Sequence, residues 1–446
     1  MAGIFREYDI RGIYPSELNE KNAHLIGIAI AGFLKTKKIV VGRDGRLSSP
    51  KLQTSLIKGI IDSGTDVIDI GLVSTPMFYH ACATLKQKGV MVTASHNPKE
   101  YNGFKICDER PVPYYYEDGI NKIEEIFSKL KQAKIKTIKK GKTAKKSITL
   151  AYLKYLHKKF SKNNYKNISA VVDFSNGAGA AAKQIFEKLK IKNKKICGKI
   201  DGKFPCHGPN PLIKGSTKKL SEEVKKSKAN IGIIFDGDAD RVFFVDEKGE
   251  FVKTDHTFAI LAEDALKNAK GNCYYDLRFS LIVEETIRAN GGKPKIMRVG
   301  NNFMKEALIN DAEGLMAAEY SDHIMYRENF CIDDALFAAL KMLSILCSGK
   351  KLSELVNPLK KYATSDEIDI AVKNKDNVLG FIEEKYKDHT IMKVDGISVY
   401  TKNYWFNVRK SNTEPKIRMR AEASDEKILN IVLKKLSDEI IAAGAV

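Results

Sequence analysis

Hydrophobic and polar positions follow two periods in the first hundred residues, one typical of helices and one typical of buried strands. Apolar residues recur at helical spacing over 24–34 and again over 50–63. Continuous apolar runs, typical of strands buried on both faces, lie in KKIVVGRDGR (37–46), around 66–70 and at the start of VMVTASHNP (90–98). Strands and helices that alternate in this way predict an α/β unit on a parallel sheet.

The same succession of strand, turn and helix returns twice along the chain. A second unit contains SAVVDFSNGAGA (169–180) and IGIIFDGDADRVFFVDEKGE (231–250). It follows a lysine-rich stretch at 129–147, which we interpret as the exit from the first unit. A third unit begins near Thr254 and ends with a helix over 333–347.

The last part of the chain, from about residue 364, has a different pattern. A helix over 378–386 precedes a hairpin at Asp395-Gly396, alternating strands and a terminal helix over 426–443. We therefore predict an α/β protein with three related mixed α/β domains and a C-terminal α+β domain. The predicted domains are 1–147, 148–252, 253–355 and 364–446.

Composition narrows the class of protein. The 446 residues are 43% hydrophobic and 29% charged, an ordinary composition for a folded protein. No apolar run approaches the ~18 residues of a membrane-spanning helix, and charges in MAGIFREYDIRG argue against a signal peptide. Seven cysteines without CxxC pairs or metal-ligand spacing predict a reduced, cytoplasmic protein. Membrane, secreted and disulfide-scaffold classes are excluded.

The net charge is +20, from 75 basic and 55 acidic residues. This excess would attract a polyanion, either nucleic acid or a phosphorylated metabolite. A general lysine bias with solvated helix faces explains it equally simply. We favour the lysine bias over attraction of either polyanion because the lysines are dispersed and lack interleaved aromatic residues.

Three aspartates alternate in DGDADR (236–241), directly after a continuous apolar strand. Asp236, Asp238 and Asp240 offer hard oxygen ligands, which Mg²⁺ prefers. The structural alternative is a solvated hairpin tip, where Asp and Gly are common. The apolar flanks IGIIF and VFFV place the turn at the carboxyl edge of a sheet, where ligand sites of α/β proteins form.

A serine follows another buried strand in TASHNP (93–98), at a sharp turn that exposes Ser95 at the sheet edge. The alternative is a capping serine on an ordinary strand–helix turn. His96 is adjacent, but the G-x-S-x-G elbow of a hydrolase is absent. Just downstream, YNGFK places Lys105 on a short strand, from which its amine can reach Ser95 as an acid/base.

The third polar turn is RKSNTEPKIR (409–418), in which Arg409 and Arg418 bracket three short polar side chains. Hydroxyls, an amide and backbone N–H groups between two guanidinium groups suit a phosphate dianion. The alternative is an ordinary polar turn between strands. Further arginines lie in YDIRG and GRDGR near the N-terminus, at Arg11, Arg43 and Arg46.

Together and in this order, these turns resemble the α-D-phosphohexomutase family, specifically its phosphomannomutase/phosphoglucomutase branch. The matching segments are FREYDIRG, VGRDGR, TASHNP with YNGFK, DGDADR and RKSNTEP. Glu319, Ser321 and His323 occupy the positions of the family's sugar-recognition loop, GExSGH. The resemblance covers the whole chain and implies four domains around a central cleft, the last of them a mobile phosphate-gripping lid.

The resemblance also implies a reaction. It implies a phosphohexomutase that interconverts hexose 6-phosphate and hexose 1-phosphate, of mannose or glucose, through a phosphoserine enzyme and a hexose 1,6-bisphosphate intermediate that also primes the enzyme. Ser95 would be the nucleophile and a ligand of Mg²⁺ together with Asp236, Asp238 and Asp240. Lys105 would be the general acid/base, with His96 and Arg241 in support. The residues implied to bind substrate are Tyr8, Arg11, Glu319, Ser321, His323, Arg409, Ser411, Asn412, Thr413 and Arg418.

Four positions differ from the family pattern, so the resemblance does not predict which hexose is preferred. Ala318 and Asp322 replace the two glycines of the sugar loop, and Arg298 and Asn301 alter the loop RVGNNF. A mutase for glucosamine phosphate is one alternative, although SNTEP rather than SGTEP argues against it. A non-catalytic protein that binds sugar phosphate or RNA is another. We expect a monomer or weak dimer with a small sugar phosphate as its partner.

Overall fold

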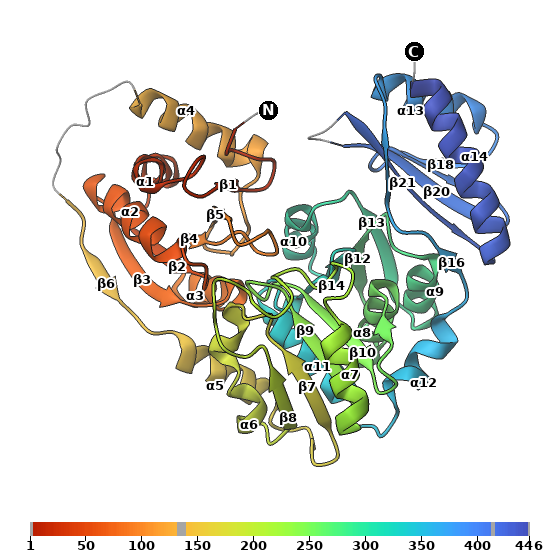
Figure 1. Cartoon of the computed structure of the whole chain (residues 1–446), viewed down its shortest axis with the longest axis horizontal. Helices are drawn as coiled ribbons and strands as arrows, with labels where there is room; N and C mark the ends of the chain where they lie inside the picture. The colour runs from red at the N-terminus through yellow and green to blue at the C-terminus, as the bar shows by residue number, and fades with distance from the viewer. Residues whose placement is uncertain (1–2, 132–139, 412–414, 445–446) are drawn as a thin grey trace. The chain divides into compact units, whose positions relative to one another are not determined.

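The computed structural model describes residues 3–131, 140–411 and 415–444 (Figure 1). It consists of two compact units, each of which contains more than one sheet. The first unit comprises the chain up to residue 252 together with 322–353, and the second comprises 253–321 together with 354 onwards. In the part of the chain that the structure describes, no helix combines the length and the apolar character that a membrane span requires.

The first sheet of unit 1 has the strand order β1-β5-β4-β2-β3-β6. Strands β2, β3, β4 and β6 run parallel, as the sequence predicts, whereas β5 is antiparallel to both β1 and β4. The strands are β1 (Ile10–Ile13), β2 (Lys38–Arg43), β3 (Asp66–Leu72), β4 (Gly89–Val92), β5 (Tyr101–Cys107) and β6 (Thr143–Lys145). The helices around this sheet are α1 (Glu20–Leu34), α2 (Ser49–Asp62), α3 (Thr75–Leu85) and α4 (Asn121–Leu130). The predicted helices and strands of this segment are therefore present within a few residues.

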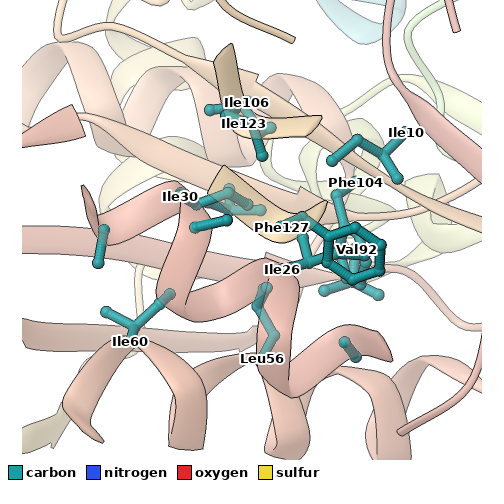
Figure 2. Packing of buried hydrophobic residues seen from close by; sticks show 14 of the residues in the cluster. Ile10, Ile26, Ile30, Leu56, Ile60, Val92, Phe104, Ile106, Ile123 and Phe127 are labelled. Carbon is teal, nitrogen blue, oxygen red and sulfur yellow. The ribbon is translucent and has the colours of Figure 1, made fainter. Parts of the chain in front are cut away.

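Both faces of this sheet are covered because its central strands, β4 and β2, carry continuous runs of buried residues without charge. In β4, Val90 and Val92 belong to the core that α1, α2 and α4 share, whereas Met91 points to the opposite face, as the two-residue period of a strand requires. Figure 2 shows Phe104 of β5 and Phe127 of α4 in that core, together with isoleucines from α1 and α2. Burial on two faces explains the continuous apolar runs in the sequence.

The second sheet of unit 1 has the order β11-β10-β9-β7-β8. Strands β7, β8 and β9 are parallel, and β10 returns antiparallel to β9 through the DGDADR turn. The strands are β7 (Ser169–Asp173), β8 (Lys192–Ile196), β9 (Ile231–Phe235), β10 (Val242–Asp246) and β11 (Phe251–Val252). The other elements of unit 1 are α5 (Thr149–Phe160), α6 (Ile185–Lys188), α7 (Lys218–Ser227), β15 (His323–Tyr326) and α11 (Ala335–Leu346).

Unit 2 contains a parallel set of strands and an antiparallel sheet. Strand β12 pairs in parallel with β13 and β14, and the C-terminal sheet pairs only antiparallel strands among its described residues. The first set comprises β12 (Asn272–Asp276), β13 (Lys293–Met297) and β14 (Gly314–Glu319), with α8 (Thr254–Asn268), α9 (Leu281–Ala289) and α10 (Asn301–Asn310). The C-terminal elements are β16 (Ala363–Thr364), β17 (Ile368–Ala371), α13 (Lys375–Lys385), β18 (Thr390–Met392), β19 (Ile397–Tyr400), β20 (Tyr404–Lys410), β21 (Lys416–Ala423) and α14 (Glu426–Gly444).

The structure confirms the predicted fold class: three mixed α/β sheets precede an α+β segment with an antiparallel sheet. The end of the lysine-rich stretch is more than a linker, since β6 pairs with β3 as an edge strand. Five of the seven cysteines are free, as the sequence predicts, but Cys197 and Cys206 are joined in a disulfide that the cysteine spacing gave no reason to expect.

One buried histidine joins α3 to α5 within unit 1. The ring of His80 lies 4.9 Å from that of Tyr155 and 5.4 Å from that of Tyr152, and the ring of Phe330 lies 5.6 Å from both His80 and Tyr155. Burial lowers the pKa of His80 to about 4. The folded protein therefore holds this imidazole neutral at pH values where the unfolded chain protonates it.

This shift predicts a pH dependence of stability. Because the pKa of His80 is lower in the folded state, its contribution is fully present above about pH 6.5 and is lost as the pH falls toward 4, by up to about 3 kcal/mol. We expect His80→Phe, which keeps an aromatic ring without a titrating group, to flatten this part of the profile. Urea unfolding of both proteins between pH 7.5 and 4 measures it, and parallel profiles would contradict the assignment.

Candidate functional site

Ser95 lies in the turn that follows β4 (the serine turn), where an uncommon backbone conformation and two hydrogen bonds fix its position. The residue has φ +48°, a left-handed conformation that is uncommon for residues other than glycine. Its N–H donates to Oγ1 of Thr93 over 2.9 Å, and its buried hydroxyl donates to Oδ2 of Asp236 over 2.9 Å. The structure thus brings together two residues that are 141 positions apart in the sequence.

Arg46 fixes the shape of the whole serine turn. Its fully buried guanidinium donates four hydrogen bonds of 2.7–3.0 Å to main-chain carbonyl oxygens. Its Nε donates to Asp44, whose carboxylate also accepts from Thr93. All five N–H donors of the guanidinium are therefore used, which a lysine could not reproduce. The four accepting carbonyls belong to Ser95, Asn97, Pro98 and Tyr101.

The acidic loop after β9 gathers three carboxylates in one buried place. Asp236, Asp238 and Asp240 are each fully buried, and each offers an oxygen within 4.8 Å of the others. The turn is tight because Ala239 has φ +60°. Burial raises the pKa of Asp236, and the charges of Asp240 and Asp238 raise it further, although Arg241 and Lys105 oppose the shift.

This carboxylate cluster fits a hard divalent cation. One oxygen of Asp238 and one of Asp240 are buried without a hydrogen-bond partner, which is costly unless an ion occupies them. The donor set is all oxygen, as Mg²⁺ prefers, and lacks the thiolate or imidazole ligands typical of zinc. Asp236, Asp238, Asp240 and the Ser95 hydroxyl are the groups that would hold it.

Lys105 supplies positive charge to the same loop. It lies on β5 opposite Met91 of β4, so its strand runs beside the one that leads to Ser95. Its Nζ donates to Asp238 over 3.1 Å and also contacts Asp240. Although burial favours the neutral amine, these two carboxylates raise the pKa of Lys105 above its ordinary value.

His96, Arg241 and His323 complete the surroundings of the serine. Nδ1 of His96 lies 3.2 Å from Oγ of Ser95, and Arg241 together with burial lowers the pKa of His96, so that ring is neutral. Arg241 donates from Nε to Nε2 of His323 over 3.0 Å. The other nitrogen of His323 lies 3.1 Å from Asp333 and 3.8 Å from Asp240. This residue of the predicted sugar loop is therefore a neighbour of the acidic loop 236–241, which we call the metal loop.

The N-terminal motif reaches the serine turn through Arg11. Its Nη1 donates to Oδ1 of Asn97 over 2.8 Å, and the same guanidinium forms an ion pair with Asp9. Tyr8, also predicted to bind substrate, lies three residues earlier and is half-buried.

The predicted sugar-binding residues of unit 2 are organised by a buried arginine. Arg278 forms an ion pair with Asp276 at 2.7 Å, and the same Nη2 lies 3.3 Å from Glu319. Burial favours the neutral acid, but the charge and hydrogen bonds of Arg278 outweigh it and hold the pKa of Asp276 below its usual range. Ser321 has a buried hydroxyl without a hydrogen-bond partner.

The two residues that replace the family's glycines differ in backbone conformation. Asp322 has φ +66°, a region that glycine enters freely and aspartate tolerates. Ala318 lies on β14 in ordinary strand conformation. The departure at position 318 is therefore conformationally neutral, whereas position 322 adds a buried side chain at a glycine-like site.

The predicted phosphate loop lies at the end of β20. Arg409 is buried and paired with Glu367, and its cross-strand partner Arg418 is paired with Asp369 at 3.4 Å. Ser411 is buried, and its carbonyl accepts a hydrogen bond of 2.9 Å from Lys375. Asn412 and Thr413 lie outside the described residues.

Several residues of these sites escaped the sequence analysis because their partners are distant in the chain. Thr75 donates to Oδ2 of Asp238 over 2.6 Å across 163 positions. Asp44, Asp333 and Lys375 likewise contact residues of other segments, namely Thr93, His323 and Ser411. Only Asp44 had a sequence signal, because it lies within the GRDGR motif.

The carboxylate cluster predicts a specific loss of metal binding. We expect Asp238→Asn to weaken Mg²⁺ binding by more than about tenfold, because it removes a charged ligand oxygen. Glu250→Gln, on the exposed hairpin turn after β10, should leave the affinity unchanged. Titration calorimetry with MgCl₂ measures both, and equal affinities for the two variants would refute the site.

Comparison with known proteins agrees with this geometry. The family of phosphoglucomutase/phosphomannomutase matches in four parts: alpha/beta/alpha domain I over 2–134, domain II over 150–249, domain III over 253–362 and the C-terminal domain over 367–439.

Individual relatives match over nearly the full chain. A phosphomannomutase of Methanocaldococcus jannaschii is 37% identical, with 99% of this chain and 98% of the relative covered. A phosphomannomutase/phosphoglucomutase of Pseudomonas syringae pv. tomato is 34% identical, with coverage of 95% and 92%. A crystal structure of a family protein from Burkholderia thailandensis superposes with a TM-score of 0.90 at 27% identity and covers 99% of this chain and 98% of that one. The chain therefore belongs to the phosphoglucomutase/phosphomannomutase family of α-D-phosphohexomutases, a family of isomerases.

Proposed function

We propose that this protein is a phosphohexomutase that interconverts the 6-phosphate and the 1-phosphate of mannose, glucose or both. The observation that carries the proposal is the hydrogen bond from the buried Ser95 hydroxyl to Asp236, within a cluster of three carboxylates suited to a divalent cation. A protein that merely bound sugar phosphate would have no use for a nucleophile in this position.

The reaction follows from the distance between the two hydroxyls of a hexose. A phosphoryl group cannot pass directly between the C1 and C6 oxygens, so the phosphorylated Ser95 donates it to the free hydroxyl. The new bond forms from that hydroxyl oxygen to phosphorus, the bond to Oγ breaks, and a hexose 1,6-bisphosphate results. The bisphosphate then reorients so that its other phosphoryl group faces Ser95. Ser95 accepts that group, and the isomerised monophosphate leaves.

Each charged residue around Ser95 has a task in this transfer. Phosphoryl transfer depends mainly on in-line positioning and on neutralising the equatorial oxygens. Mg²⁺, when bound by the three aspartates, supplies positive charge to the phosphate. Arg241 adds a fixed guanidinium, and Lys105, whose amine Asp238 and Asp240 keep protonated, is the general acid that gives its proton to the leaving oxygen and recovers one from the attacking hydroxyl. His96, neutral because Arg241 and burial lower its pKa, orients the serine hydroxyl.

The remaining predicted residues bind the parts of the substrate that do not react. Arg409, Ser411 and Lys375 lie at one loop and suit a phosphate dianion. Glu319 and Ser321 bind sugar hydroxyls, with Arg278 holding the carboxylate in place. The remaining members of the proposed substrate-binding set are Tyr8, Arg11, His323, Asn412, Thr413 and Arg418.

We further propose that the enzyme is cytoplasmic and that it is a monomer or weak dimer. Its proposed domains are 1–147, 148–252, 253–355 and 364–446. A hexose 1,6-bisphosphate is the proposed primer. A coupled assay across the 1-phosphates of mannose, glucose and glucosamine tests the substrate, and turnover of glucosamine phosphate alone would assign the chain to the sister mutases. RNA retention that falls with salt, without turnover of any sugar phosphate, would indicate a binding protein instead.

The nucleophile assignment makes the first prediction from this function. Ser95→Ala should abolish isomerisation, by at least about 10³-fold in kcat, because no other group can carry the phosphoryl group. The melting temperature should change little, and Mg²⁺ should still bind because the three aspartates remain. Full turnover by this variant in the coupled assay would refute the nucleophile.

The second prediction concerns hexose preference and the buried side chain of Asp322. Asp322→Gly keeps the positive φ and removes the buried side chain, so the ratio of mannose to glucose turnover should change by at least about threefold while the fold stays intact. Ala318→Gly is the matched control, with no change in the ratio expected. If both variants keep the wild-type ratio, Asp322 has no part in selectivity.

A further inference from the structure

The disulfide in the second sheet of unit 1 lies outside the proposed chemistry. It joins Cys197, the residue directly after β8, to Cys206, nine positions later, with the Cα atoms 6.2 Å apart. Cys206 is exposed and Cys197 is half-buried, so reagents in solution can reach the pair. By contrast, Cys82 and Cys107 approach to 3.8 Å but are fully buried and remain unbonded.

The loop that this bond closes packs on the residue that holds the serine turn. The Phe204 ring lies under the Arg46 guanidinium, 5.2 Å from its centroid. Gly202 approaches so closely that a Cβ there would lie 2.5 Å from the backbone nitrogen of Leu47. Ile200 packs against Gly45 on the other side of Arg46. The closed loop therefore supports the main chain on both sides of Arg46.

Just beyond Cys206 the chain contacts the metal loop through Pro209. Gly237, between two of the metal-loop aspartates, donates its N–H to the Pro209 carbonyl over 3.0 Å. A Cβ on Gly237 would lie 2.9 Å from the Pro209 side chain, so the two backbones are in contact. Asn176 ties both ends of the loop, because its amide accepts from the Cys206 N–H and its own N–H donates to the Cys197 carbonyl.

We propose that Cys197 and Cys206 form a reversible redox site whose disulfide braces the serine turn and the metal loop at once. A cytoplasmic protein keeps thiols reduced unless they exchange with another disulfide, and accessible pairs are the ones that do so. The site itself does not depend on the proposed mutase activity, whereas its effect on turnover does.

The chemistry is thiol–disulfide exchange with a small disulfide such as oxidised glutathione. The exposed Cys206 thiolate attacks one sulfur of the reagent, forms a mixed disulfide and releases one thiol. Cys197, as its thiolate, then attacks the Cys206 sulfur and releases the second thiol. Two protein thiols and one small disulfide thus become one protein disulfide and two small thiols, and excess dithiol reverses the sequence.

Peptide mapping tests whether the bond forms. The protein is treated with oxidised glutathione or with dithiothreitol, alkylated and digested with trypsin. Trypsin cleaves after Lys195, Lys199, Lys203 and Lys214, so the oxidised sample should contain the cross-linked pair 196–199 and 204–214. The reduced sample should contain the same two peptides separately alkylated. Absence of the cross-linked pair at every glutathione ratio would overturn the proposal.

A second measurement tests the bracing role. Closing this loop should raise the melting temperature by about 3–8 °C in the oxidised protein. We expect kcat/KM to fall about two- to fivefold on reduction, because the supports of Arg46 and Gly237 loosen. A cross-link that changes neither the melting temperature nor turnover would overturn the brace. A cross-link with the melting shift in a protein without mutase activity would refute only the proposed function.

Cysteine variants identify the thiols responsible. Cys197→Ser and Cys206→Ser should each remove the redox dependence of the melting temperature and behave as the reduced wild type. Cys347→Ser is the matched control, since Cys347 is a half-buried free cysteine after α11. It should retain the full shift. A shift that persists in Cys197→Ser would assign the effect to other thiols and overturn the site.

Discussion

The burial of negative charge at the carboxyl end of β9 is the constraint on which the rest of unit 1 depends. Asp236, Asp238 and Asp240 lie out of reach of solvent, where uncompensated carboxylates cost several kcal/mol each. Lys105 and Arg241 contribute two positive charges from different segments. One buried oxygen each of Asp238 and Asp240 still has no hydrogen-bond partner, and a divalent cation at this candidate site would complete the balance. The fold must therefore bring positive charge to these three carboxylates.

Backbone conformation supports the same arrangement at some cost to stability. Ser95 and Ala239 both adopt left-handed φ values, which a non-glycine residue enters only when its surroundings enforce it. Arg46 and Thr93 enforce it at the serine turn, and the Asp236 carbonyl accepts the Ala239 N–H at the metal loop. The two turns are therefore preorganised, as phosphoryl transfer requires.

Local patterns in the sequence predicted the elements and the turns, but not the contacts made between distant segments. DGDADR and TASHNP were recognisable because apolar strands precede them, and Lys105 because its strand follows the serine turn. Thr75, by contrast, looks like an ordinary residue at a helix start, and its bond to Asp238 exists only in the folded chain. The Cys197–Cys206 disulfide likewise depends on a loop path that spacing alone does not specify.

The attachment of the serine turn through main-chain oxygens has a consequence for how such enzymes can diversify. Arg46 recognises carbonyl groups, which every amino acid carries, and ignores the identities of the residues that bear them. The exposed side chains of residues 98 to 100 can therefore be exchanged without breaking the hydrogen bonds that Arg46 donates to the turn. The side chains of that segment are open to change, whereas replacing Arg46 would release all four carbonyl groups at once.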